Sequence, residues 1–517
     1  MKRLLLVGAA LMVLAAVPLA ANAQDEIVLE PVTIDVFGIQ AVVPEGWQPV
    51  GPGVVARASS ATDVALIAQQ SAPIPAGQLL QAVLPQLGLT EAPEPVGELT
   101  TDYLTWTLYQ VDVEAPVIGT VRVDVAMAQG IGASYTVMMQ ATAGEFDSLH
   151  EQVFLPALEA LQPLVTTTEP EATDEPAPYS EEAVTFTGGA EDVTLAGTLT
   201  IPAGDGPFPA IVLVSGSGPQ DRNETISGTT MRPFALLADA LARAGVAVLR
   251  YDDRGAGEST GDFSTALTED FTADAAAAIA WLQAQPGINP EQVGVLGHSE
   301  GGMVAAQLGA QDEAAFIISL AGPSVPGTEL LLQQNRRLLA AMNTPQEDID
   351  LQVSLLSHLF PLVLDGKMDE AEQYVREVAA EAYDDLDAAT QAQYGSAERF
   401  ANLSVQTLLA QFTPWMLNFL RLDPADFWGQ TTAPVLALYG TLDVQVDSDQ
   451  NAGPLEAILT EAGNEDATVI VLTGANHLFQ AAETGAVQEY GMLPPEFTPD
   501  LIPTILDWLT EQGIIGG

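Results

Sequence analysis

Residues 181–517 alternate short apolar runs with longer amphipathic stretches, and this alternation leaves few folds open to the chain. An apolar run of strand length without polar alternation is buried on both faces, and strands joined by helices pair in parallel. We therefore predict an α/β fold, a mostly parallel sheet with helices on both faces. The expected strands are a hairpin over 184–201 and single runs at 210–214, 246–251, 293–296, 316–320, 435–439 and 468–472.

The 517 residues exceed what one ordinary core needs, so the chain is expected to divide into domains. Residues 24–165 carry strand-like runs and one amphipathic helix, which predicts a small α+β domain. Residues 166–180 are rich in Thr, Glu and Pro and poor in apolar residues, which predicts a linker. Within the second domain, 181–517, residues 324–430 show helical patterns alone, and an insertion of that length predicts a helical cap over one edge of the sheet.

The first residues have the pattern of an export signal. A basic start at residues 2–3 precedes the apolar run 4–19. Ala21 and Ala23 are small residues at the two positions that a signal peptidase recognises before the cleavage site. We expect cleavage after Ala23, so that residues 1–23 are a signal peptide and the mature chain is secreted or extracytoplasmic, in the cell envelope. The apolar run is short for a bilayer span, which favours cleavage over an uncleaved anchor. No other stretch of the sequence reaches the roughly 18 uninterrupted apolar residues that a span needs, so we expect no stable membrane insertion after cleavage.

Charge and cysteine content exclude several classes of function. The chain has 69 acidic and 15 basic residues and a formal net charge of −54, which repels nucleic acid and predicts a strongly solvated surface. It has no cysteine, which excludes a lipoprotein anchor, disulfides, thiolate metal sites and a cysteine nucleophile. The motifs of zinc peptidases, phosphate loops and dinucleotide folds are absent from the sequence, so we expect no metal and no cofactor.

The pentapeptide Gly297-His298-Ser299-Glu300-Gly301 lies between a predicted strand and a predicted helix. In that context the pattern G-x-S-x-G forms a nucleophile elbow, a turn so tight that side chains two residues before and after the serine would clash. The turn lifts the serine hydroxyl clear of the sheet at the N-terminus of a helix, where developing negative charge is favoured. Ser299 is therefore the predicted nucleophile.

A serine hydroxyl is a poor nucleophile at neutral pH and needs a base within hydrogen-bond reach. The chain has only four histidines. His477 follows the last predicted strand and returns to the edge of the sheet where Ser299 is expected, so we predict that it is the base. His298 is expected to point to the other side of the elbow, while His150 and His358 lie in the small domain and the predicted cap.

The acid that orients the base should follow the serine and precede the histidine in the chain. Asp443 comes directly after the predicted strand at 435–439, at the edge to which His477 returns. Asp447 and Asp449 are the alternatives, and we favour Asp443 because acids further into a loop are more often solvated.

An oxyanion hole needs two backbone donors aimed at the tetrahedral intermediate. One is expected to be the N–H of Glu300, the residue after the nucleophile. The other is expected from the glycine-containing loop after the strand at 210–214, where we favour the N–H of Ser217 and keep Gly216 as the neighbouring choice.

These pieces resemble the α/β-hydrolase superfamily, in particular its bacterial esterase, dienelactone-hydrolase-like and serine-aminopeptidase-like members, over residues 181–517. One departure is that Ser215-Gly216 stands where many members have His-Gly, which leaves open what braces the oxyanion loop. Residues 24–165 resemble the small PsbP-like or Mog1-like sandwiches, a likeness that implies no activity. The matching segments of the larger domain are Ser215 to Arg222, Arg250 to Ser259, the elbow, the strand end at Asp443 and the loop at His477.

The expected chemistry is attack of Ser299 on an ester or amide carbonyl, with an acyl-enzyme that water then hydrolyses. We favour a carboxylic-ester hydrolase acting on a small molecule. A serine aminopeptidase acting on short peptides is the first alternative, and it would need carboxylates near the nucleophile to hold a free amino group. The cap supplies candidates for that role, and a solvated helix face explains them equally: Glu347, Asp348, Glu370 and Glu372. The second alternative is a non-catalytic cell-envelope binding module.

Overall fold

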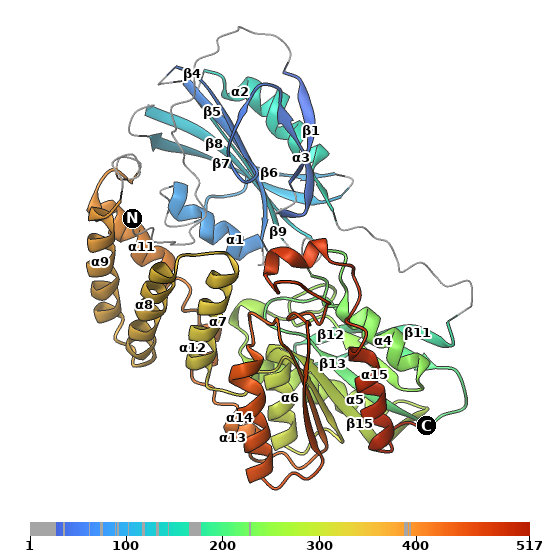
Figure 1. Cartoon of the computed structure of the whole chain (residues 1–517). Helices are drawn as coiled ribbons and strands as arrows, with labels where there is room; N and C mark the ends of the chain where they lie inside the picture. Colours follow the sequence, from blue (N-terminus) through green and yellow to red (C-terminus); the bar gives the residue numbers. More distant parts are fainter. Residues whose placement is uncertain are drawn as a thin grey trace.

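The computed structural model separates into an N-terminal sheet domain and a larger α/β domain (Figure 1). The predicted signal peptide, residues 1–23, and most of the predicted linker lie outside the described residues. The structure describes residues 27–34, 37–60, 63–72, 76–87, 89, 92–101, 103–115, 119–130, 134–142, 144–164, 177–226, 229–386, 391 and 394–516.

The N-terminal domain is built around a seven-stranded antiparallel sheet in the order β3-β4-β5-β9-β8-β7-β6. Residues of β9 alternate between its two faces: Val137 and Met139 pack toward α2 and α3, whereas Met138 packs toward α1. A smaller sheet, β1-β2-β10, completes the domain. The bounds are β1 Leu29–Ile34, β2 Ile39–Pro44, β3 Gln48–Gly51, β4 Val54–Ser60, β5 Asp63–Ala72, α1 Ala76–Val83, β6 Gly97–Thr100, β7 Thr105–Ala115, β8 Gly119–Gln129, β9 Ser134–Thr142, α2 Phe146–Leu149, α3 Leu155–Ala160 and β10 Gln162–Pro163.

The larger domain confirms the predicted fold class. Its eight-stranded sheet has the order β11-β12-β14-β13-β15-β16-β17-β18, antiparallel through the first two pairs and parallel from β14 onward. The central strands are fully buried because helices cover both faces: α4 contacts α15, and α5 contacts α6. The bounds are β11 Tyr179–Thr187, β12 Thr194–Pro202, β13 Phe208–Val214, α4 Pro233–Arg243, β14 Ala247–Tyr251, α5 Thr268–Gln283, β15 Ile288–His298, α6 Glu300–Ala310, β16 Ile317–Leu320, β17 Val435–Gly440, α14 Ser448–Glu461, β18 Ala467–Leu472 and α15 Leu501–Glu511.

Two boundaries differ from the sequence-based expectation. Tyr179 and Ser180 were expected in the linker but belong to β11, where the Tyr179 hydroxyl donates to Asp239 over 2.7 Å. The predicted cap, 324–430, also ends too late, because α13 (Ala425–Trp428) contacts α6 and α14 and the buried Trp428 packs in the core of the sheet domain. A helical pattern alone does not show which neighbour a helix packs against.

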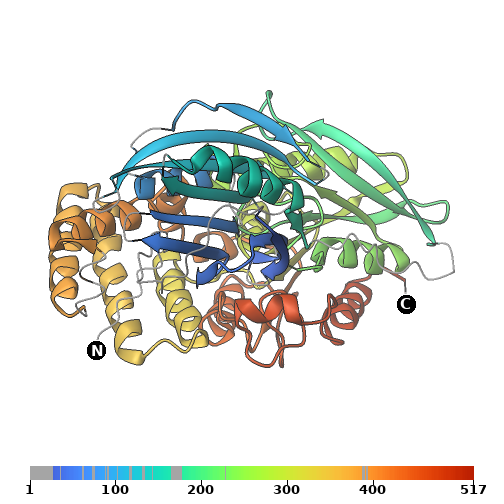
Figure 2. The ribbon, with the colours of Figure 1, turned by 90° about the horizontal axis from the view of Figure 1, so that it is seen from above.

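The remaining helices of the insertion form a cap with a core of its own. Leu355, Leu359 and Phe360 are buried there among apolar side chains of the neighbouring helices. The cap helices, yellow to orange, gather at one side of the molecule, and the C-terminal helix lies at the opposite side (Figure 2). They are α7 Gly327–Ala341, α8 Gln346–Leu364, α9 Met368–Asp384, α11 Ala397–Leu409 and α12 Pro414–Phe419.

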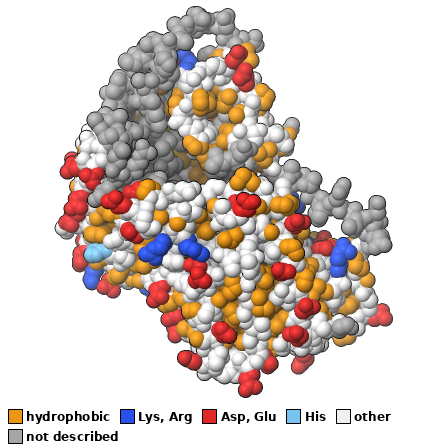
Figure 3. All heavy atoms as spheres, in the orientation of Figure 1, with side chains coloured by type: hydrophobic (Ala, Val, Ile, Leu, Met, Phe, Trp, Pro, Cys, Tyr) orange, Lys and Arg blue, Asp and Glu red, His pale blue; other side chains and the backbone are white. Residues whose placement is uncertain are grey.

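The surface agrees with the solvated character expected from the composition. On the face shown in Figure 3, acidic side chains are scattered rather than gathered into one patch, and basic ones are few. None of the helices in the described part of the chain is both long and apolar enough to cross a bilayer.

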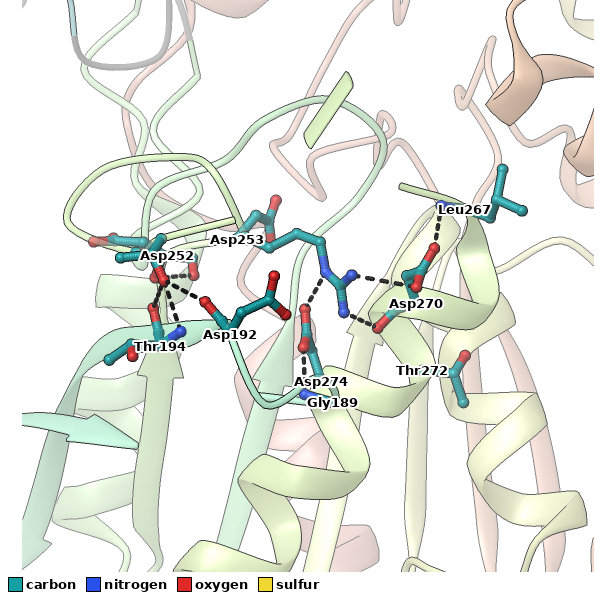
Figure 4. A network of polar contacts seen from close by, with 12 residues as sticks. Gly189, Asp192, Thr194, Asp252, Asp253, Leu267, Asp270, Thr272 and Asp274 are labelled. Carbon is teal, nitrogen blue, oxygen red and sulfur yellow. Dashed lines mark hydrogen bonds and ion pairs between the residues drawn. The ribbon is translucent and has the colours of Figure 1, made fainter. Parts of the chain in front are cut away.

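The turn after β14, which belongs to the segment resembling the superfamily, ties β14 to its neighbours. Arg254 is buried and donates to the carboxylate of Asp274 on α5 over 2.6 Å, and Asp274 also accepts the backbone N–H of Gly189 over 2.7 Å (Figure 4). In the same turn, Asp252 binds the guanidinium of Arg222 over 2.6 Å. The turn therefore holds α5 and the start of the sheet together.

We predict that Asp274→Ala lowers the free energy of unfolding by about 3 kcal/mol, because the buried Arg254 guanidinium loses its buried carboxylate and keeps only its pair with the more exposed Asp270. The measurement is urea denaturation of the full chain. Asp365→Ala, which removes an exposed pair with Lys367, is the control and should change that free energy by less than about 1 kcal/mol. Equal effects of the two substitutions would contradict the assignment of Asp274 as a structural anchor.

Candidate active site

The elbow predicted from the pentapeptide is present between β15 and α6. Ser299 has a positive φ of 54° and stands at the N-cap of α6, and its N–H donates to the carbonyl of Leu320 over 2.9 Å. A Cβ on Gly297 would lie 1.9 Å from the carbonyl oxygen of Gly301, and a Cβ on Gly301 would lie 2.1 Å from the carbonyl oxygen of Val214. The two glycines are therefore required by backbone contact, and the serine occupies a strained conformation.

Asp443 and His477 are brought together at the carboxyl ends of β17 and β18. The Nδ1 of His477 lies 2.8 Å from an Asp443 carboxylate oxygen, and both side chains are buried. The other Asp443 oxygen accepts the backbone N–H groups of Gln445 and Val446 over 2.7 and 2.9 Å. An ionised carboxylate can only accept, so the His477 proton is on Nδ1 and the Nε2 lone pair is available as a base.

The alternative acids lie elsewhere. Asp447 caps the N-terminus of α14 through the N–H of Asp449, and it accepts hydrogen bonds from Gln333 and Arg337 of the cap over 2.7 and 3.1 Å. Asp449 itself is exposed. Neither is hydrogen-bonded to a histidine.

His298 does not point away from the site, contrary to expectation. Its ring centroid lies 4.8 Å from that of His477, and its Nε2 donates to the His477 carbonyl over 2.9 Å. The other two histidines are remote in the fold: His358 stacks on Tyr374 within the cap, and His150 pairs with the buried Asp124 in the N-terminal domain. That second pair is an acid–base couple that the sequence patterns of residues 24–165 did not indicate.

The ring contact places His477 beside the residue that precedes Ser299. Among the described residues no hydrogen bond joins the Ser299 hydroxyl to His477. Hydrogen bonds of this kind are often long in the absence of substrate and tighten when substrate binds.

The loop after β13 runs directly against the elbow. A Cβ on Gly216 would lie 3.0 Å from the Cβ of Ser299. The N–H of Gly216 donates to a carboxylate oxygen of Glu224 over 2.9 Å, whereas the N–H groups of Ser217 and Glu300 have no acceptor among the described residues. These two amides, and not that of Gly216, are thus available to an oxyanion.

Buried acids brace this loop where many superfamily members have a histidine. The hydroxyl of Ser215 donates to Asp253 over 2.8 Å, and the backbone N–H of Gln220 donates to the other Asp253 oxygen over 2.9 Å. Burial raises the pKa of Asp253 well above its usual value. Asp253 lines a small cavity beneath the loop together with Gly216 and Glu300.

The cap is attached to the residue that follows the serine. The indole N–H of Trp415, on α12, donates to Glu300 over 2.9 Å, and the hydroxyl of Thr268 donates to the same oxygen over 2.7 Å. Burial raises the pKa of Glu300, and hydrogen bonds from Trp415, Thr268 and Ser217 act in the opposite direction without reversing the shift. Sequence patterns did not single out Trp415 for this contact, because the two residues are 115 positions apart.

The cap acids that could have held a substrate amine have other environments. Glu372 pairs with Arg376 on the same helix, and Glu347 and Glu370 are exposed to solvent. Asp348 is buried in the cap, beside Leu339 and Leu355.

Comparison with known proteins supports the fold class and the class of enzyme. The model of a family described as X-Pro dipeptidyl-peptidase (S15 family) matches residues 189–467, more than half of the chain. This chain belongs to that family. It is therefore a serine hydrolase with an α/β-hydrolase domain, as predicted, and membership gives no support to the non-catalytic alternative. The matched S15 segment includes Ser299 and Asp443 but ends before His477.

A curated relative of this S15-family chain is the esterase EstD of Thermotoga maritima, which is 27% identical over 351 residues, 67% of this chain and 72% of EstD. Among solved structures, a Pyrococcus furiosus esterase aligns with a TM-score of 0.38 at 16% identity, over 66% of this chain and 94% of that chain. An α/β hydrolase of Penicillium aligns with a TM-score of 0.38 at 18% identity, over 64% of this chain and 98% of that chain.

We predict a pH-dependent difference in stability between the wild type and Glu300→Gln. The folded-state pKa of Glu300 is raised above its usual value of 4.5, so above pH 4.5 the unfolded carboxyl ionises while the folded one still holds its proton. The unfolding free energy of the wild type, relative to that of the variant, should therefore be highest below pH 4.5. It should fall as the pH rises from 4.5 through the raised folded-state pKa of Glu300.

Urea denaturation of both proteins from pH 4 to pH 8 measures this difference. A wild type that gains stability relative to the variant as the pH rises would show that the pKa of Glu300 is lowered, not raised.

Proposed function

We propose that this chain is a secreted carboxylic-ester hydrolase that works through an acyl-enzyme intermediate on Ser299. His477 is the general base, Asp443 orients it, and the N–H groups of Ser217 and Glu300 form the oxyanion hole. The observation that carries the proposal is the hydrogen-bonded Asp443–His477 pair, buried at the strand ends beside the elbow. The backbone amides of Ser217 and Glu300 have no acceptor in the described chain; Glu300 follows Ser299 directly, and Ser217 follows Gly216, where an added Cβ would lie 3.0 Å from the Cβ of Ser299.

In the first half of the reaction, His477 Nε2 takes the hydroxyl proton of Ser299 as the oxygen attacks the ester carbonyl. The tetrahedral intermediate places its negative oxygen at the amides of Ser217 and Glu300. His477 then gives the proton to the leaving alkoxide, and the C–O bond to the alcohol breaks. Asp443 keeps the Nδ1 proton in place and stabilises the imidazolium that forms.

In the second half, a water molecule replaces the alcohol. His477 takes a proton from the water, and the resulting hydroxide attacks the acyl carbonyl. Collapse of the second tetrahedral intermediate returns the proton to Ser299 and releases the carboxylic acid. No metal or other cofactor takes part in these steps.

An ester substrate is favoured over an aminopeptidase substrate by the state of the nearest carboxylates. Glu300 accepts from Trp415 and Thr268, and Glu224 accepts from Gly216 and His298; both are buried. Neither is open to a substrate ammonium. The relative EstD carries the name esterase, in agreement with this preference.

The family description keeps a peptidase as the second candidate, because it names X-Pro dipeptidyl-peptidases. Such an enzyme uses the same acyl-enzyme chemistry on an amide after proline and needs a carboxylate that reaches the substrate amine.

Location in the cell envelope or outside the cell is part of the proposal and rests on the N-terminal sequence alone. Cleavage after Ala23 would leave a mature chain that begins at Gln24.

We predict that Ser299→Ala abolishes hydrolysis of a nitrophenyl ester, and that Asp443→Asn lowers kcat by about 10⁴-fold because the imidazole takes the wrong tautomer. Steady-state kinetics of the purified chain measures both, with circular dichroism to show that each variant is folded. A Ser299→Ala variant as fast as the wild type would rule out the proposed nucleophile.

We predict a higher kcat/KM for short acyl nitrophenyl esters than for aminoacyl and X-Pro naphthylamides, because the buried carboxyl groups of Glu224 and Glu300 beside the elbow already accept hydrogen bonds from the protein. The same enzyme preparation is assayed with both substrate sets, and Ser299→Ala gives the background for each. A preference for an X-Pro amide would make the peptidase the favoured function instead of the ester hydrolase, with Ser299 still the nucleophile.

A further inference from the structure

Glu224 is a buried acid that the reaction steps above do not use. It lies in the loop between β13 and α4 with a positive φ of 51°, and it is 1% exposed. One carboxylate oxygen accepts from two directions: from the N–H of Gly216 over 2.9 Å and from Nδ1 of His298 over 2.7 Å. The other oxygen is buried without a partner among the described residues. Glu224 therefore joins the oxyanion loop to the residue before the nucleophile.

His298 continues this chain of contacts to the base. Its Nε2 faces the backbone carbonyl of His477 over 2.9 Å, and its Nδ1 faces the Glu224 carboxylate. A carbonyl can only accept, so Nε2 carries a proton, and the short contact to Glu224 shares a second proton. The pair as a whole has no net charge, which suits its complete burial.

The electrostatics agree with this protonation. Burial lowers the pKa of His298, but the charge of Glu224 and its hydrogen bond outweigh that effect, so that the net shift is upward.

We propose that Glu224 and His298 are a positioning pair. They hold the Gly216–Ser217 loop and the His477 backbone in fixed positions relative to Ser299. The proposal rests on the function proposed above and assigns no contact with substrate to either residue. Glu224 fixes the peptide that precedes the Ser217 amide, and His298 fixes the peptide that carries the base. Two loops that are far apart in the sequence thereby share one buried anchor.

The expected size of the effect follows from the geometry that the reaction needs. An oxyanion donor acts when it lies 2.7–3.1 Å from the oxyanion, and misplacement of a reacting group by about 1 Å lowers the rate by about 10²-fold. Asp443 orients the imidazole of His477 from one side, while His298 holds the backbone of the same residue. Loss of the anchor should therefore slow the chemical step more than it weakens substrate binding.

The test compares Glu224→Ala and Glu224→Gln with the wild type in the full chain. A fluorophosphonate titrates the reactive serine, so that kcat is expressed per competent site and unfolded molecules do not contribute. For Glu224→Ala we expect kcat per titrated site and the labelling rate to fall about 10²-fold, with KM for a nitrophenyl ester within about threefold of the wild type.

Glu224→Gln is the conservative variant and stays informative if Glu224→Ala does not fold. The glutamine oxygen can still accept a hydrogen bond, but the charge that balances His298 is lost, so we expect kcat per titrated site to fall about tenfold. An activity more than twofold below the wild type but above that of Glu224→Ala supports the proposal. A Glu224→Gln value within twofold of the wild type would overturn it.

Asp274→Ala is the matched control, because it also removes a buried carboxylate but one bonded to Arg254, away from the elbow. We expect it to be less stable yet to keep kcat per titrated site within twofold of the wild type. An equal loss of kcat in Asp274→Ala, or a Glu224→Ala value within threefold of the wild type, would overturn the positioning role. Hydrolysis by Ser299→Ala at the wild-type rate would instead overturn the proposed function, so the two failures are distinguishable.

Discussion

Close backbone packing around Ser299 is the constraint on which the rest of the site depends. The turn brings the elbow so near to the end of β13 that only glycine fits at Gly301, and α6 lies so near to the loop after β16 that a Cβ on Gly302 would be 2.5 Å from the Cα of Gly322. This contact places the oxyanion loop beside the serine. Parallel pairing places the carboxyl ends of β13, β15 and β16 at the same edge of the sheet as the loops that follow β17 and β18.

The site collects buried carboxyl groups in a chain whose other acids are mostly solvated. Asp253, Glu224 and Glu300 surround the same loop, and each has local donors: a serine hydroxyl, a backbone amide, a histidine, a threonine or an indole. Burying a carboxyl group is unfavourable unless hydrogen-bond donors are present. These contacts therefore explain why the three carboxyl groups can be buried at the site. The large negative charge of the surface and the acids of the site therefore have different physical roles.

The cap joins the reaction site at two points. Trp415 reaches the residue after the nucleophile, and Arg337 with Gln333 reaches Asp447, four residues after the acid. Movement of the cap would change hydrogen bonds at both loops. The cap has an apolar core of its own, formed by residues such as Leu359 and Phe360, while Leu330 of α7 and Phe419 of α12 are buried in the core of the sheet domain and anchor the base of the cap there.

Local sequence determined the elements and the elbow, because strand and helix periodicity and the glycine spacing act over a few residues. Chain order and the common edge of parallel strands were enough to favour Asp443 over Asp447 and to select His477 from four histidines. Sequence could not place Glu224, the side chain of His298, or Trp415, because their contacts join residues 74, 179 and 115 positions apart. Only the packing of the loops and the cap decided those contacts. Hydrogen bonds between distant segments depend on where the tertiary structure brings their donors and acceptors, and local sequence periodicity does not predict those positions.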